Sequence, residues 1–102
     1  MEVRDSFGKA FKLARRSKSL TQEDFSVISS RTFVSLIERG GTSPTLDKLD
    51  SLCTVLNIHP VTLLAFTYLL GSGEPGDVEV LLGKVCDELK GLLTDAEPPL
   101  IF

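Results

Sequence analysis

Histidine and cysteine are scarce in this chain of 102 residues, which contains one histidine and two cysteines. With a single histidine, His59, there is no Ser/His/Asp or Cys/His arrangement, and the glycines are not spaced as a phosphate-binding loop. Cys53 and Cys86 lack metal-ligand spacing and each lies in an apolar helical pattern, so we expect two reduced core residues rather than a disulfide. We therefore expect no enzyme, no bound metal and no cofactor.

Long apolar runs and a secretion signal are also missing. The longest apolar stretch, residues 61–70, is interrupted by two threonines and is about half of the ~20 residues that a membrane helix needs. The first residues do not combine a basic segment with an apolar one, as a signal peptide does. The length has room for one domain, without a separate ligand-sensing part. We expect a cytoplasmic protein with no membrane span and no small-molecule ligand.

The net charge of −3 hides an asymmetry between the two halves of the chain. Residues 1–45 carry eight Lys and Arg against five Asp and Glu, a net +3, and residues 46–102 carry three against nine, a net −6. Affinity for phosphate depends on the local field rather than on the total charge. The first half therefore remains a candidate for binding nucleic acid.

Apolar residues recur at helical spacing along the chain, and no segment alternates for long enough to be a strand. The sequence predicts an all-α protein with helices over about residues 4–18, 22–28, 31–39, 46–56, 60–70 and 77–93. The residues Thr21, Ser30, Thr45 and His59 stand where helix N-caps belong. We expect a DNA-binding domain over 1–70, a linker over 71–76, and a C-terminal dimerisation helix and tail over 77–102. The tail contains two consecutive prolines that cannot continue a helix.

The helix expected after Ser30 has one apolar side and one polar side. Val34 and Ile37, three residues apart, form the side that should be buried. The residues roughly opposite are Thr32, Ser35, Leu36 and Arg39, with Arg31 and Phe33 on the flanks. A short helix anchored behind and carrying arginine and hydroxyl groups in front suits a DNA groove. An arginine there can bind a guanine edge with two hydrogen bonds, although a solvated surface arginine is the alternative.

From about residue 7 to residue 64 the chain resembles the Cro/repressor-type (XRE-like) helix-turn-helix regulators. It is similar in particular to restriction–modification controller proteins and phage-type regulators. The matching segments are Leu-Thr-Gln-Glu-Asp at 20–24, the whole of 30–40, and Ser-Pro-Thr-Leu at 43–46. The resemblance implies a five-helix repressor-like domain, here followed by a C-terminal helix. It also implies that the third helix enters the major groove and that a homodimer binds a near-palindromic operator.

The same resemblance implies roles for individual residues. The expected DNA-contacting residues are Gln22, Ser30, Arg31, Thr32, Phe33, Ser35, Leu36, Arg39, Thr42 and Ser43. Arg15 and Glu38 match a buried ion pair that ties the first helix to the end of the third. The turn before the third helix is two residues shorter than usual and has no glycine, so we expect a shortened second helix or a tighter turn.

The helix over 60–70 is apolar on nearly all sides, and the helix over 77–93 carries an apolar stripe. The stripe can fold back on its own subunit or pair with a second copy, and we expect the second arrangement. The expected dimerisation residues are Phe66, Leu69, Leu70, Leu81, Leu82, Val85 and Leu89.

These observations together predict a sequence-specific transcriptional regulator, of repressor type in its fold, that binds double-stranded DNA as a homodimer. Two other classes stay open. An antitoxin would neutralise a protein partner and also bind DNA. A protein-bridging co-activator would make little use of the third helix.

Overall fold

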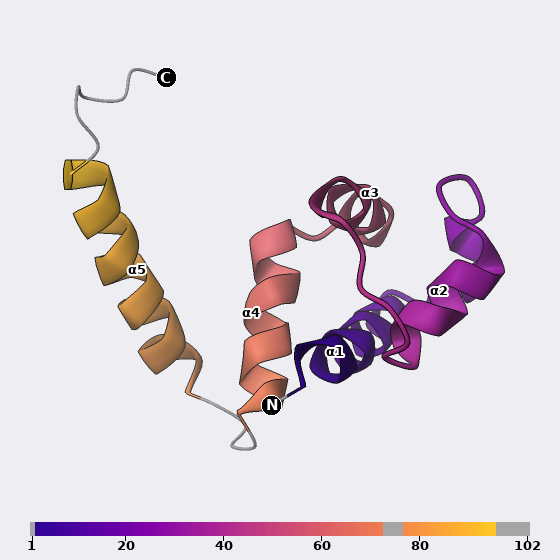
Figure 1. Cartoon of the computed structure of the whole chain (residues 1–102), viewed down its shortest axis with the longest axis horizontal. Helices are drawn as coiled ribbons and strands as arrows, with labels where there is room; N and C mark the ends of the chain where they lie inside the picture. The colour runs from indigo at the N-terminus through magenta and orange to yellow at the C-terminus, as the bar shows by residue number, and fades with distance from the viewer. Residues whose placement is uncertain (1, 73–76, 96–102) are drawn as a thin grey trace.

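The computed structural model describes residues 2–72 and 77–95, and within these ranges the chain is helical (Figure 1). Its elements are α1 (Val3–Ser17), the 3-10 turn η1 (Gln22–Phe25), α2 (Arg31–Glu38), α3 (Leu46–Leu56), α4 (Pro60–Gly71) and α5 (Val78–Asp95). The predicted all-α fold is confirmed. Residues 73–76 of the expected linker and the expected tail over 96–102 lie outside the described residues.

All four predicted N-cap positions are confirmed, and at Thr21 the backbone N–H donates to the Asp24 carboxylate at 2.6 Å. The side chains of Ser30, Thr45 and His59 each accept a hydrogen bond from a backbone N–H in the first turn of the following helix, at 3.1, 3.1 and 3.0 Å. Each bond satisfies one of the N–H groups that the start of a helix leaves without an intrahelical partner. These caps fix the first residue of α2, α3 and α4.

The core lies where α1 crosses α4 and where α2, α3 and η1 close over it. Its fully buried apolar side chains include Phe11, Phe25, Val34, Ile37, Leu52, Leu56 and Leu63. The ring of Phe11 in α1 lies 5.2 Å from the ring of Phe25 in η1, in the tilted arrangement that aromatic pairs prefer. Burial of Val34 and Ile37 confirms which side of α2 faces inward.

Gly8 lets α1 approach the end of α2. A Cβ atom at this position would lie 2.6 Å from the carbonyl oxygen of Ile37 and 2.7 Å from that of Glu38. Carbon cannot pack that closely against backbone oxygen, so a side chain here would push the two helices apart. The close approach brings the last residue of α2 within reach of side chains on α1.

The second helix is shortened, as the short glycine-free turn predicted, and it is of 3-10 type rather than the expected α-helix over 22–28. Residues Gln22–Phe25 form a single 3-10 turn, and the backbone N–H groups of Ser26 and Ile28 bond to the carbonyls of Glu23 and Phe25, three residues earlier. The connection is too short for a full α-helix because Phe25 must reach the core and Ser30 must already cap α2.

The expectation that both cysteines lie in the core holds for Cys53 and is wrong for Cys86. Cys53 is 1% exposed, and burial, with a smaller contribution from Asp50, raises the pKa of its thiol to about 11. Cys86 is exposed, on a helix whose main contact with the other described elements is with α4. Along α5 only Leu81 and Val85 are half-buried.

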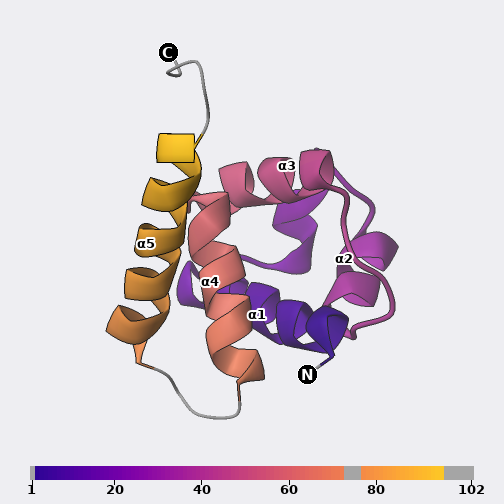
Figure 2. The ribbon, with the colours of Figure 1, turned by 60° about the vertical axis from the view of Figure 1, so that its left-hand side comes forward.

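The helix α5 stands beside α4, on the side opposite α2, in both ribbon views (Figures 1 and 2). No single helix of the described residues is long and apolar enough to cross a membrane. Helices α3 and α4 pass that test only when taken together, and they are bent by 99° at the break between them. The described residues also contain no group of three or more His, Cys, Asp or Glu that could hold a metal ion.

Candidate nucleic-acid interface

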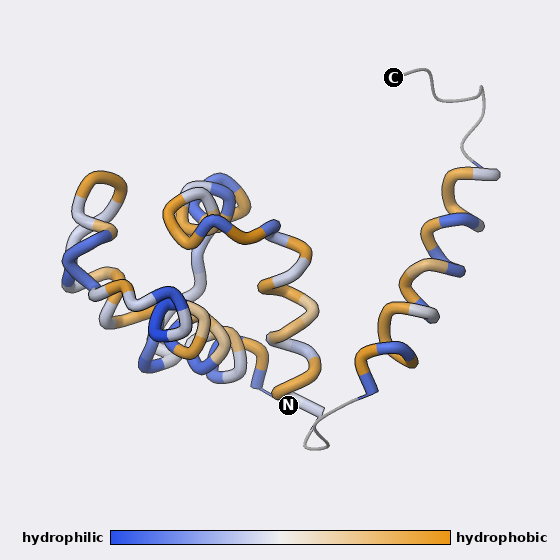
Figure 3. Tube along the Cα trace, turned by 180° about the vertical axis from the view of Figure 1, so that it is seen from behind, coloured by the Kyte–Doolittle hydropathy of each residue, from blue (hydrophilic) through white to orange (hydrophobic). Residues whose placement is uncertain are grey.

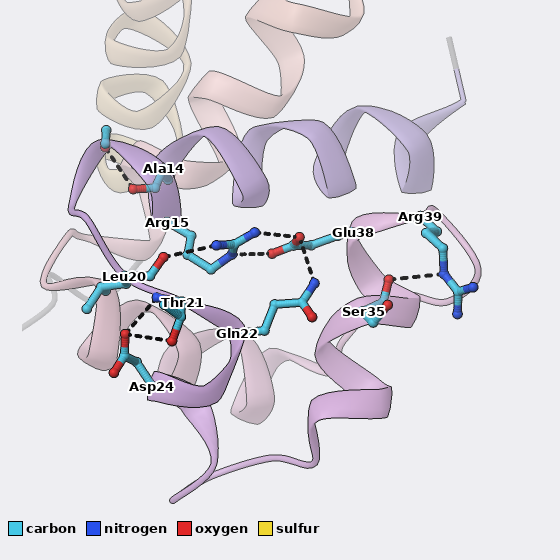
Figure 4. A network of polar contacts seen from close by, with 10 residues as sticks. Ala14, Arg15, Leu20, Thr21, Gln22, Asp24, Ser35, Glu38 and Arg39 are labelled. Carbon is cyan, nitrogen blue, oxygen red and sulfur yellow. Dashed lines mark hydrogen bonds and ion pairs between the residues drawn. The ribbon is translucent and has the colours of Figure 1, made fainter.

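A buried ion pair joins α1 to the last residue of α2 (Figure 4). The Arg15 guanidinium donates to both carboxylate oxygens of Glu38, from Nε at 2.6 Å and from Nη2 at 3.0 Å. The two side chains are 10% and 4% exposed. Hydrogen bonding to Glu38 raises the pKa of Arg15 above its already high ordinary value, so the guanidinium stays charged.

Two further bonds extend this network to the segment before α2. The third donor of Arg15, Nη1, bonds to the carbonyl oxygen of Leu20 at 2.9 Å. Gln22, the first residue of η1, donates its amide to Glu38 at 3.1 Å. In Figure 4 the amide oxygen of Gln22 points away from Glu38. The end of α1, the start of η1 and the end of α2 are thus held by one set of charged hydrogen bonds.

The glycine-free turn between η1 and α2 is held by Lys48, which the sequence analysis missed. Its Nζ donates to the carbonyl oxygen of Ile28 at 2.6 Å and lies 5.9 Å from the centre of the Phe33 ring. The lysine lies in the first turn of α3, so it links that helix to the turn at Ile28 and to α2 at Phe33. No local pattern identifies such a residue, because its partner is a backbone group 20 positions away.

The outward side of α2 gathers many of the residues predicted to contact DNA. Arg31, Thr32 and Arg39 are exposed and Ser35 is half-buried. A shallow hollow of about 290 Å³ is lined by Gln22, Arg31, Thr32, Ser35 and Arg39. We call this hollow and its lining the recognition face. Its residues come from η1, from α2 and from the C-cap of α2, and the hydrogen bond between Gln22 and Glu38 joins η1 to α2.

Three of the other predicted contact residues, Ser30, Phe33 and Leu36, also make contacts within the chain. Leu36 is half-buried and lies against the loop after α2. Its Cδ1 is so close to Gly41 that a Cβ atom on this glycine would lie only 2.4 Å from it. Phe33 is half-buried beneath Lys48, and the Ser30 hydroxyl caps α2. In the loop that follows α2, Ser43 is exposed and Thr42 is half-buried. The loop turns at Gly40, whose φ of +76° suits glycine.

Arg31 has a partner in the free protein. Its Nη1 lies 3.3 Å from Oε1 of Glu23 in η1, and the two side chains are 69% and 64% exposed. Arg39 bends back along α2, where its Nε donates to the carbonyl oxygen of Ser35 at 3.4 Å (Figure 4). Both arginines therefore lie along the recognition face rather than extending freely into solvent.

The helix-turn-helix family HTH_3 matches residues 11–63, just over half of the chain. This stretch begins within α1, ends in the first turn of α4, and includes η1 and α2. The chain belongs to this helix-turn-helix family. The resemblance to the Cro/repressor-type (XRE-like) regulators is thereby confirmed.

This helix-turn-helix protein is also similar to a protein of Sinorhizobium fredii (strain NBRC 101917 / NGR234), named as an uncharacterized HTH-type transcriptional regulator, y4dJ. The two are 36% identical over 69 residues, which cover 66% of this chain and 90% of the relative. No solved structure shows a significant match to the chain.

The buried ion pair leads to a prediction about stability. Arg15→Met or Glu38→Leu alone leaves an uncompensated charge beneath α2 and should lower the free energy of unfolding by about 3–5 kcal/mol. The double variant should recover much of that loss. Chemical denaturation of the two single variants and the double variant, followed by circular dichroism, measures the three values. Single variants as stable as the parent would contradict the conclusion that Arg15 and Glu38 form a buried ion pair that excludes water.

Proposed function

We propose that this helix-turn-helix protein is a cytoplasmic transcriptional regulator that binds a palindromic DNA operator as a homodimer. Family membership supports DNA binding, and the similarity to a protein named as an HTH-type transcriptional regulator supports a role in transcription. The observation that carries the proposal is the recognition face, in which polar and basic side chains of α2 stand in front of a buried apolar side. A helix so arranged fits the major groove.

Each part of the recognition face has a proposed task. Arg31 reads a base edge at the start of α2, where recognition helices reach deepest into the groove. Thr32 and Ser35 offer hydroxyls to bases or to phosphates further along. Gln22 and Arg39 stand at the two edges of the hollow and contact the DNA backbone. The other predicted contact residues lie outside the lining of the hollow and are proposed to surround it: Ser30, Phe33, Leu36, Thr42 and Ser43.

The charge distribution supports the same orientation. The net positive charge of the chain lies in residues 1–45, which contain α1, η1 and α2. The acidic second half contains α3, α4 and α5. Contact with phosphates is therefore favourable on the side that presents α2 and unfavourable on the side of α5.

Substitution of Arg31 tests base reading. Arg31→Ala should weaken binding to a DNA site selected from a random pool by about 1–3 kcal/mol, and should weaken binding to random-sequence DNA much less. The control is Arg16→Ala, which removes the same charge from an exposed position of α1. This control should affect the two DNAs equally. Fluorescence anisotropy with both duplexes measures the losses, and equal losses for Arg31→Ala would contradict the proposed role.

A second copy of the chain is the proposed partner of α4 and α5. A groove of about 320 Å³ between these helices has an apolar lining: Val61, Thr62, Ala65, Phe66, Leu69, Val78 and Leu82. Apolar side chains also continue beyond it, with Leu89, Leu92 and Leu93 of α5 each more than half exposed. Figure 3 shows hydrophobic residues on several sides of α4 and at intervals along α5. An apolar surface of this extent is typical of an interface.

The proposed interface includes the residues predicted from the sequence. Within the single chain, Leu81 and Val85 are half-buried and Leu82 and Leu89 are exposed, so the stripe of α5 is only partly covered. On α4, Phe66 and Leu69 are half-buried and Leu70 is 36% exposed. A symmetric dimer through these helices would present two copies of α2, about 34 Å apart, to successive turns of the major groove.

A charge placed on the stripe tests the dimer. Leu89→Asp should weaken self-association and operator binding at least about tenfold, because a two-fold interface would bury each Leu89 side chain and the substitution occurs twice. Val80→Asp is the matched control, since Val80 is 66% exposed and lies on the opposite side of α5 at 100° per residue. Analytical ultracentrifugation measures association. A parent protein that sediments as a monomer at tens of micromolar would contradict the proposal.

A further inference from the structure

Glu23 lies at the edge of the recognition face with its carboxylate directed at the proposed base-reading arginine. Its Oε1 is 3.3 Å from Nη1 of Arg31. The pair joins η1 to the first residue of α2, eight positions further along the chain. It is the second ion pair found among the described residues. Unlike the buried Arg15–Glu38 pair, it is exposed to solvent.

The geometry of this contact leaves the guanidinium able to read a base. Glu23 engages one nitrogen of Arg31, at the end of the fork. An arginine carries five N–H donors, and a guanine edge needs two that lie side by side, such as those on Nε and Nη2. The side of the Arg31 guanidinium that carries Nε and Nη2 is therefore free to bind a guanine, while the Glu23 carboxylate restrains the side chain through Nη1.

We propose that Glu23 is a positioning residue that increases the preference of the protein for its own DNA site. Its carboxylate holds Arg31 in front of α2, in place for a guanine edge. Its negative charge also repels the phosphates to which Arg31 would otherwise bind on DNA of any sequence. The inference rests on the proposed function, in which Arg31 reads a base.

The two effects act in opposite directions on the two kinds of DNA. A restrained arginine loses less side-chain entropy when it binds the correct base, so Glu23 favours the specific complex. A carboxylate close to the DNA backbone disfavours the non-specific complex, which depends on phosphate contacts. Each effect is small, because exposed charge interactions are weak. The ratio of the two affinities combines both effects.

The test is Glu23→Ala, measured on a duplex selected from a random pool and on a random-sequence duplex of equal length. The ratio of affinities should fall about three- to tenfold, through weaker binding to the selected duplex and tighter binding to the random one. The slope of log affinity against log salt on random DNA should steepen by up to about one, since Arg31 gains a phosphate contact. Glu79→Ala removes the same exposed group from α5 and should leave the ratio unchanged.

The Arg31→Ala background separates the possible failures. Combined with Arg31→Ala, the Glu23→Ala change should alter the ratio much less, because the positioned group is gone and only the repulsion between the Glu23 carboxylate and phosphates remains. If Arg31→Ala weakens both duplexes equally, the proposed function itself is wrong. If Arg31→Ala acts only on the selected duplex while Glu23→Ala leaves the ratio intact, the role of Glu23 is overturned. An unchanged effect of Glu23→Ala in the Arg31→Ala background would also overturn it.

Discussion

The Arg15–Glu38 ion pair is the interaction on which the position of α2 depends. A planar guanidinium that donates two parallel hydrogen bonds to a carboxylate accepts little variation in geometry, and this pair is almost fully buried. It holds the C-terminal end of α2 against α1, where Gly8 leaves room for the close approach. Because Gln22 shares the same carboxylate, η1 is fixed relative to α2 as well. The outward side of α2 is thus left to meet other molecules.

Much of the fold follows from short-range chemistry that a sequence displays. Ser30, Thr45 and His59 cap helices because a polar side chain precedes each apolar helical pattern, and those helix starts were predicted correctly. The inward side of α2 follows from the spacing of Val34 and Ile37. The partnership of Arg15 and Glu38 is different. Its members are 23 positions apart, and only the family resemblance indicated it.

The features that the sequence did not predict depend on contacts between distant segments. The 3-10 turn of η1 results from the demand that Phe25 reach the core within a short connection. Lys48 holds the turn from another helix, and Leu36 leaves the outward side of α2 to cover the loop at Gly41. Cys86 is exposed because an apolar stripe does not reveal how much of a helix its own chain covers. These features can be recognised only once the helices are placed relative to one another.

We propose that α2, held from behind by the ion pair, reads DNA sequence through its outward side. Selection of bound duplexes from a random pool, followed by methylation interference at guanine N7, tests this claim most directly. We expect enrichment of two inverted half-sites about one helical turn apart, with a major-groove guanine in each whose methylation blocks binding. A pool that shows no enrichment after repeated rounds, with binding that depends only on salt, would contradict it.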